Sequence, residues 1–160
     1  MSGGLEPGHD GPPIHRHKHM SESFEVQSGT LDIFIDGEWR EFPAGSTYTV
    51  PVGGSHAARN HHDEPAHIVH IHSPAGKMEE FFTVFCALVR AGRIKSVPPK
   101  DPRSLFLLTN LFASYREDIE FLKPPPPVYM VIATVGKMLG YRLPDPRPTT
   151  ADALLEEGGR

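Results

Sequence analysis

Three things are scarce in this sequence: cysteine, charge of one sign and long apolar runs. The only cysteine, Cys86, excludes an internal disulfide and a thiolate-rich zinc site. The formal net charge is −4 and no basic tract is present, which argues against nucleic acid and anionic membranes as partners. The longest apolar stretch near the C-terminal end, residues 128–140, is too short to span a bilayer.

The N-terminal segment also lacks the features of an export signal. Residues 1–10 are rich in glycine and polar side chains, without a basic segment or an apolar segment. We therefore expect this segment to be flexible and the protein to be cytoplasmic.

Glycine, proline and histidine, in contrast, are plentiful. The 160 residues include 15 glycines and 17 prolines, one residue in five, so the chain turns often. Hydrophobic residues make up 38% of the chain, enough for a buried core in one domain. The unusual number is 10 histidines, and the functional interpretation starts from them.

The first half of the sequence has the pattern of short strands separated by turns. Leu31, Ile33 and Ile35 alternate with other residues, and the Asp36–Gly37 pair that follows is a strong hairpin signal. The predicted strands are 23–27, 30–35, 38–42, 47–50, 56–60 and 66–72. Short strands at this spacing predict a small antiparallel barrel or sandwich.

The second half changes to helical spacing. Asp101 followed by Pro102 is a typical N-cap and first helical position. The predicted helices are 78–94, one from 102 with Ile119 on its apolar face, and 128–139, with a linker at 95–100 and a rigid proline spacer at 124–127. Cys86, beside Phe85, is expected to be buried in the first helix. The polar tail from Leu143 is expected to be disordered.

Two histidines at the start of the strand region are spaced to share one ligand. Side chains repeat with period two along a strand, so His15 and His17 point the same way and can bind one divalent ion. Glu22 lies five residues beyond His17, and it joins the same site only if a loop or bulge falls within residues 18–21. An unbroken strand would instead present His19, which is the alternative ligand.

A second segment can return another imidazole to the same ion. Gly45, Pro51 and Gly53 shape a turn, and His56 begins the strand that follows it. Asn60, at the end of that strand, is expected to hold the strand end by hydrogen bonds.

The remaining histidines have simpler interpretations. We expect His61, His62 and His67 to belong to a polar turn. His70 and His72 share one strand face with Ile68 and are expected to be ordinary strand residues, although one of them could line a pocket. The inward apolar residues are expected mainly to pack the core and secondarily to form walls of a cavity; they are Phe24, Val26, Leu31, Ile33 and Ile35.

These two histidine segments resemble the paired motifs of the cupin superfamily. The first motif, G-x5-H-x-H-x3–4-E-x6-G, is matched by His15, His17, Glu22 and Gly29, but not at its leading glycine. The second, G-x5-P-x-G-x2-H-x3-N, is matched at every fixed position, by Gly45, Pro51, Gly53, His56 and Asn60.

The resemblance implies a small single-domain, metal-binding cupin similar to quercetinase-like conserved barrels. It implies a jelly-roll barrel over residues 11–75. The helical extension over 76–142, which we expect to pack on the barrel, and the tail over 143–160 lie outside the resemblance. One divalent ion per chain would be held by His15, His17, Glu22 and His56. This donor set suits Fe, Mn, Ni, Co, Cu or Zn. Together with a divalent ion, the three neutral histidines and the glutamate carry a net charge of +1, which favours an anionic oxygen ligand.

Three functions are compatible with this resemblance. The first is a dioxygenase-like oxidoreductase acting on a small oxygen-chelating organic substrate, with Glu22 as ligand and catalytic base. The second is an isomerase or hydrolase that uses the ion as a Lewis acid. The third is a non-enzymatic module that binds or senses a small ligand. Cupins commonly pair through their sheets, so a homodimer is expected, and the helices could cover a sheet, the dimer seam or the barrel mouth.

Overall fold

Strands fill the first half of the chain and helices most of the second half. The computed structural model describes residues 2–146. Its strands are β1 (Ser2–Leu5), β2 (His15–Arg16), β3 (Ser21–Ser28), β4 (Thr30–Ile35), β5 (Glu38–Pro43), β6 (Thr47–Val50), β7 (Ala57–Arg59), β8 (Ala66–Ser73) and β9 (Glu120–Phe121). Its helices are α1 (Met78–Arg90), α2 (Pro102–Ser114) and α3 (Pro126–Met138).

All strand pairs are antiparallel and form three sheets. A four-stranded sheet has the order β1-β8-β3-β6, a three-stranded sheet the order β5-β4-β7, and β2 pairs with β9. The Asp36–Gly37 hairpin joins β4 to β5, and both turn residues have the positive φ angles, 54° and 89°, that a tight hairpin needs. The predicted antiparallel sheets with three following helices are confirmed, whereas closure into a barrel stays a prediction.

The apolar side chains form two cores. The alternation in β3 and β4 buries one face of each strand, because inward and outward side chains alternate along a strand. The buried residues between the sheets are Phe24, Val26, Leu31, Ile33, Ile35, Val50, Ala58 and Ile68. The helical core contains Met78, Phe81, Val84, Leu88, Ile94, Leu107, Leu108, Leu111, Phe112, Tyr115, Ile119, Phe121 and Tyr129, and also Met20 from the β segment.

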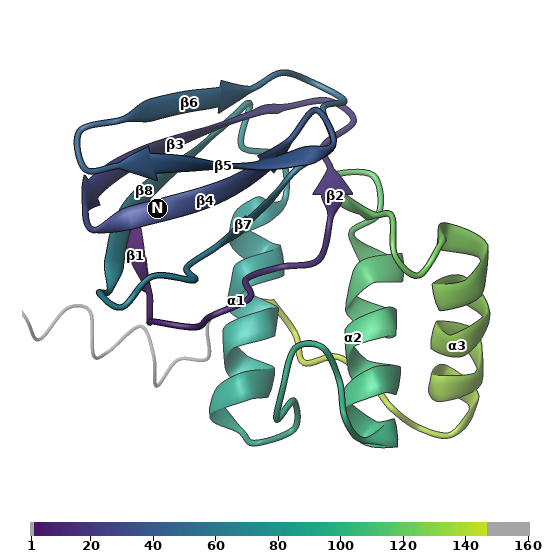
Figure 1. Ribbon diagram of the computed structural model, residues 1–160. Coiled ribbons are helices and arrows are strands. Elements are labelled where there is room, and N and C mark those ends of the chain that lie inside the picture. Colours follow the sequence, from purple (N-terminus) through teal and green to yellow (C-terminus); the bar gives the residue numbers. More distant parts are fainter. Residues whose placement is uncertain (1, 147–160) are drawn as a thin grey trace, which may run out of the picture.

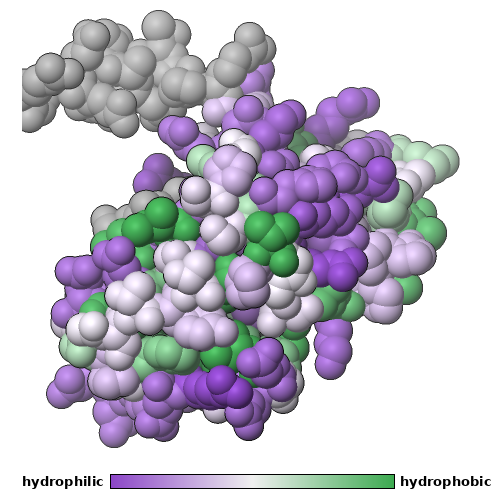
Figure 2. Space-filling view, turned by 90° about the horizontal axis from the view of Figure 1, so that it is seen from above, coloured by the Kyte–Doolittle hydropathy of each residue, from purple (hydrophilic) through white to green (hydrophobic). Residues whose placement is uncertain are grey.

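The three helices stand side by side below the sheets (Figure 1). Seen from above, the surface of the molecule shows hydrophobic side chains only in small patches among hydrophilic and neutral ones (Figure 2). Within residues 2–146, none of the helices combines the length and the apolar character needed to cross a bilayer.

Several local predictions need correction. Residues 2–5 form a strand, β1, that pairs with β8, where no strand was predicted. The helix from Pro102 ends at Ser114, so Ile119 is buried outside it. The predicted proline spacer is partly helical, because α3 begins at Pro126 and proline suits the first helical turn.

Cys86 is exposed, contrary to the prediction that it is buried. The buried face of α1 is formed by Met78, Phe81, Val84 and Leu88, and position 86 points away from it. Of the predicted tail, residues 143–146 contain no helix or strand, and residues 147–160 lie outside the described residues.

Candidate metal site

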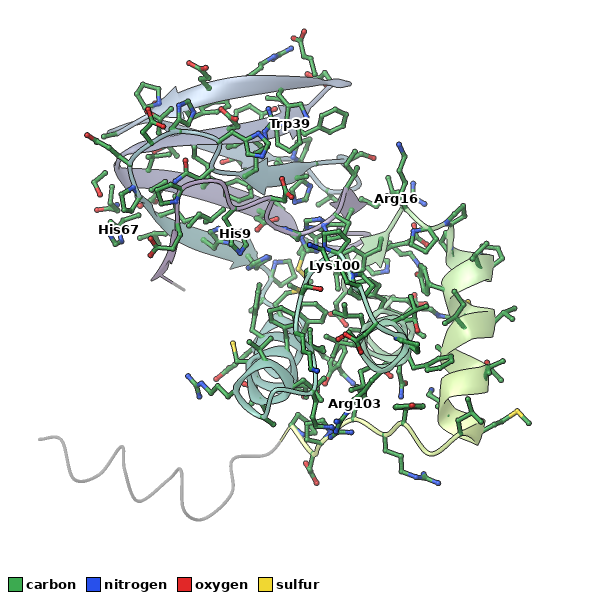
Figure 3. The ribbon with its side chains drawn as sticks, turned by 60° about the horizontal axis from the view of Figure 1, so that its bottom comes forward. His9, Arg16, Trp39, His67, Lys100 and Arg103 are labelled. Atoms are coloured by element: carbon green, nitrogen blue, oxygen red, sulfur yellow. The ribbon has the colours of Figure 1, made fainter. Side chains whose placement is uncertain are left out.

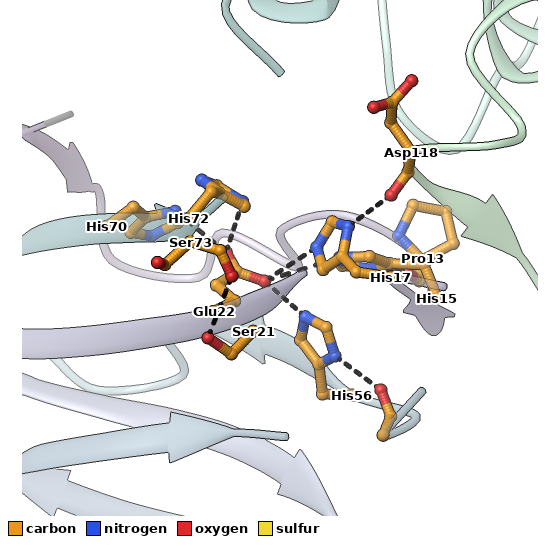
Figure 4. Close-up of polar contacts among 11 residues, drawn as sticks. Pro13, His15, His17, Ser21, Glu22, His56, His70, His72, Ser73 and Asp118 are labelled. Carbon is orange, nitrogen blue, oxygen red and sulfur yellow. Dashed lines mark hydrogen bonds and ion pairs between the residues drawn. The ribbon is translucent and has the colours of Figure 1, made fainter. Parts of the chain in front are cut away.

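The structure brings together the four predicted ligands. His15, His17, Glu22 and His56 are buried, and one ligand atom from each lies within 4.8 Å of the others. His15 belongs to β2, Glu22 to β3, and His56 lies just before β7 (Figure 4). The chain bends at residues 18–19, between His17 and the start of β3 at Ser21, as Glu22 requires in order to join the site.

Glu22 and not His19 meets the three imidazoles. Its Oε2 atom lies 4.0 Å from Nε2 of His15, 3.1 Å from Nε2 of His17 and 2.5 Å from Nε2 of His56. His19 lies in the bend and is exposed to solvent. In a continuous strand His19 would point the same way as His17, and Glu22 the opposite way. The bend turns Glu22 toward the histidines and leaves His19 facing solvent.

Each imidazole is held by its other nitrogen through a backbone carbonyl. Nδ1 of His15 donates to the carbonyl oxygen of Pro13 at 2.8 Å, and Nδ1 of His56 to that of Gly54 at 3.1 Å. Nδ1 of His17 donates to the carbonyl oxygen of Asp118 at 2.7 Å. A carbonyl oxygen only accepts, so the proton of a neutral ring is on Nδ1 and the Nε2 lone pair faces Glu22.

Burial keeps His15 neutral, whereas the ionised carboxylate of Glu22 favours a cation in the cluster. Burial first, and then the neighbouring His56, lower the pKa of His15 from 6.5 to about 3. Burial alone would raise the pKa of Glu22, but its close contacts with the surrounding histidines, His17 first, hold it well below 4.5. Lone pairs and a carboxylate that converge in a buried space repel one another unless a proton or a metal ion lies between them. These four residues therefore fit a divalent ion.

Two further histidines contact the second oxygen of Glu22. Nδ1 of His70 and Nε2 of His72 each lie 3.3 Å from Oε1. Both come from β8, whose antiparallel register places His72 directly opposite Glu22 and His70 opposite Phe24. The sequence showed that they share a strand face, but it did not show that this face meets Glu22, because strand register depends on long-range pairing.

The other predicted polar residues lie outside the cluster. Asn60 is buried and donates to the carbonyl oxygens of Leu5 and Glu64, so it holds its strand end as predicted. His61 and His62 contact carboxylates elsewhere, those of Asp10 and Asp32.

Asp32, Glu41 and His62 form a second group close enough to hold a cation. The buried carboxylate of Asp32 already has partners for both of its oxygens. Oδ2 accepts from Nε of Arg59 at 3.1 Å, and Oδ1 lies 3.0 Å from Nε2 of His62. The guanidinium of Arg59 also lies over the Trp39 ring, 3.9 Å from its centroid. This group is therefore a salt-bridge network on the three-stranded sheet.

A cavity of about 480 Å³ opens onto the cluster. His15, Glu22, His70 and His72 line one side of it, together with Phe24. Side chains of α1, α2 and β9 line the other side, so the helices cover the side of the sheets on which the histidines lie. Of the five predicted wall residues, Phe24 lines the cavity, whereas Val26, Leu31, Ile33 and Ile35 pack in the β core.

A family model described as a cupin domain matches residues 3–72. Residues 3–72 are a cupin domain. This segment includes the four clustered residues and β1 through most of β8, and it starts before the predicted boundary at residue 11. The match covers less than half of the chain, and the helical part lies beyond it.

Several solved structures resemble 44% of this chain. A protein of Thermus thermophilus is 20% identical with a TM-score of 0.42, over 44% of this chain and 67% of that one. A sugar phosphate isomerase of the cupin superfamily from Silicibacter pomeroyi is 26% identical with a TM-score of 0.42, over 44% and 46%. A cupin protein of Bacteroides fragilis is 29% identical with a TM-score of 0.41, over 44% and 60%. The chain thus spans about half to two thirds of the length of these proteins. A comparison with curated proteins found no match.

The cupin motif glycines have a physical role in this chain. Gly29 adopts a φ of 74° between β3 and β4, and a Cβ atom there would clash with the carbonyl oxygen of Pro65. Gly45 has a φ of 85° in open space. Residue 29 must therefore be glycine both for its positive φ angle and for the close approach of Pro65, whereas residue 45 needs glycine only for its positive φ angle.

Proposed function

We propose that this cupin domain binds one divalent transition metal and works as a dioxygenase-like oxidoreductase on a small organic substrate that chelates through oxygen. The observation that carries the proposal is the convergence of three buried imidazoles, each fixed through Nδ1, with Glu22 at the side of a largely apolar cavity. His15, His17, Glu22 and His56 would hold the ion. A bound transition metal supplies Lewis acidity and, when redox-active, electron transfer to dioxygen.

The chain itself contributes orientation, exclusion of water and a proton acceptor. The backbone carbonyls of Pro13, Gly54 and Asp118 keep the Nε2 atoms directed inward. The apolar cavity walls limit water around the site and favour an organic ligand.

Glu22 is the proposed catalytic base. It is ionised and lines the cavity, so its carboxylate can take the proton of a substrate hydroxyl. His70 and His72, both 3.3 Å from Oε1, hold that oxygen in place and provide imidazoles next to it.

Oxygen consumption tests the proposal. Protein loaded separately with Fe, Mn, Co, Ni, Cu or Zn is mixed with a chelating phenol in an oxygen-electrode cell. We expect uptake with at least one redox-active ion and none with Zn, and Glu22→Gln should abolish the uptake while the protein remains folded.

Two outcomes would contradict the oxidoreductase. Full turnover of a substrate with Zn under anaerobic conditions would identify the isomerase or hydrolase alternative, in which the ion is only a Lewis acid. Metal and ligand binding without turnover under any condition would identify the binding module. The homodimer and the cytoplasmic location predicted from the sequence stay predictions, and light scattering of the purified protein tests the first.

A further inference from the structure

The cavity wall that faces the histidines comes from the part of the chain outside the cupin match. α1 supplies the largest share of this wall, with Phe82 within ring-contact range of His72, at 6.4 Å between centroids. The aromatic and aliphatic lining residues beyond residue 76 are Met78, Phe81, Phe82, Phe85, Val89, Ile94, Val97, Leu108, Phe112, Ile119 and Phe121. The helical extension therefore forms much of the cavity wall.

Polar and apolar groups are segregated across this cavity. The polar lining residues His15, Glu22, His70 and His72 lie together on the β side. Among the described residues that line the helical side, the only polar side chains are those of Lys95 and Ser96. Hydroxyl groups placed against the phenylalanine rings would lose their hydrogen bonds to water without gaining others, which is costly. A ligand with many hydroxyls, such as a sugar, is thus disfavoured on the helical side.

The size of the cavity gives a second constraint. A volume of about 480 Å³ is in the range of sites that hold drug-sized molecules. An acid of two or three carbon atoms would contact the polar side and leave the aromatic wall without a partner.

We infer that the ligand of this site is an amphipathic oxygen chelator, with an anionic oxygen head at the histidine–Glu22 cluster and an apolar body that packs against α1. The inference rests on the proposed function, because the head binds through the ion held by the cluster. It goes beyond that function by assigning substrate selection to the helical extension.

Calorimetric titration with hydroxamates of different length tests the inference. Acetohydroxamate and octanohydroxamate carry the same chelating head and differ by six methylene groups. For full-length protein loaded with Zn, burial of each added methylene should tighten binding roughly fourfold until the tail leaves the cavity. Equal dissociation constants for the two compounds would overturn the inference.

Wall variants show where the tail binds. Phe82→Ser should remove most of the gain from the longer tail and leave the affinity for acetohydroxamate unchanged. Val89→Asp, at a cavity-lining residue that is 44% exposed, should do the same if Phe82→Ser does not fold. The matched control is Val131→Asp on α3, which is 64% exposed and does not line the cavity; it should retain the full gain. If a folded Phe82→Ser protein binds octanohydroxamate more tightly than acetohydroxamate by the same factor as the wild type, the inference is also overturned.

The two proposals fail in different ways. If wild-type protein takes up no Zn in a direct metal titration, the proposed function fails. If Zn binds and acetohydroxamate binds but the longer tail adds nothing, only the inference on the apolar body fails.

Discussion

At the scale of single residues, the site depends on where each imidazole keeps its proton. His15, His17 and His56 all donate through Nδ1 to backbone carbonyls, so backbone conformation decides that Nε2 faces Glu22. His15 in addition stays neutral because it is buried beside His56, which lowers its pKa to about 3. A buried neutral histidine and a buried ionised carboxylate both make folding sensitive to acid.

The stability of the metal-free protein should therefore fall with pH below 6.5. Unfolded His15 takes up a proton near pH 6.5 and folded His15 only near pH 3, so between these values the unfolded state binds more protons. Glu22 acts in the same direction below pH 4.5, since its pKa is lowered by folding. Urea unfolding at pH 7.5, 6.0 and 5.0 should show a decrease approaching about 1.4 kcal/mol per pH unit for each proton.

The control for this prediction is His15→Asn. Asparagine keeps a donor near the position of Nδ1, for the Pro13 carbonyl, but has no titratable group. Its unfolding free energy should vary less with pH between 7.5 and 5.0 than that of the wild type. An identical slope in both proteins would show that His15 is not the source of the pH dependence.

Two motif glycines form a matched pair for a stability test. Alanine at Gly45 must adopt only an unfavourable φ of 85°, which costs about 1–2 kcal/mol. Alanine at Gly29 has the same conformational cost, and its Cβ also clashes with the Pro65 carbonyl oxygen. The free energy of unfolding should fall more for Gly29→Ala than for Gly45→Ala, by at least ~1 kcal/mol. Equal losses in urea unfolding would mean that the turn at Gly29 moves away from Pro65 at little cost.

At the scale of elements, the short pair of β2 and β9 connects the cupin domain to the helical part. Nε and Nη2 of Arg16 in β2 both contact Oε2 of Glu120 in β9, at 2.6 and 2.5 Å, and Arg16 lies where the sheets meet the helices (Figure 3). Lys18 adds a contact at 3.4 Å. The turn just before β9 supplies the Asp118 carbonyl that holds His17, so this pairing positions a ligand of the site.

Loosening β9 should therefore weaken metal binding. Glu120→Ala removes the carboxylate of β9 that pairs with Arg16 and Lys18. The affinity for Zn should fall about tenfold, a typical loss when a group that orients a metal ligand is disturbed. Glu117→Ala is the control, because that side chain is 64% exposed and contacts Lys18 only at 3.7 Å. Competition titrations with a chromophoric chelator measure both affinities, and equal values for the two variants would contradict the positioning role of β9.

The elements that depend on local signals were predicted well. Alternation predicted β4 with its observed bounds, the Asp36–Gly37 turn was confirmed, and Asp101 caps α2 by accepting from the backbone N–H of Ser104. The resemblance to the cupin motifs also implied the four residues that lie together in the candidate site. Local periodicity and turn chemistry are encoded in neighbouring residues, so sequence alone carries them.

Features that depend on distant pairing were missed. Strands β2 and β9 have two residues each and lie about a hundred positions apart, so no periodic pattern marks them. The contacts of His70 and His72 with Glu22 follow from the register of β8 on β3. The helical wall of the cavity likewise depends on which surface α1 packs against. Apolar residues at helical spacing predict a buried helix face but do not specify its partner.

At the scale of the whole molecule, the two cores meet at the candidate metal site. Met20 lies in the chain between His17 and Glu22, yet it is buried in the helical core. Phe121 lines the cavity and packs in the same core. The cupin domain and the helical part thus build one site together, with the ligand residues from the first and much of the cavity from the second.

The metal content of purified protein tests the central claim most directly. Elemental analysis after loading and gel filtration should give about one divalent ion per wild-type chain, and far less for His56→Ala. His61→Ala, which changes an exposed histidine outside the cluster, should match the wild type. A wild-type protein without a bound ion, or a folded His56→Ala protein with an undiminished ion content, would contradict the claim that these four residues hold the metal.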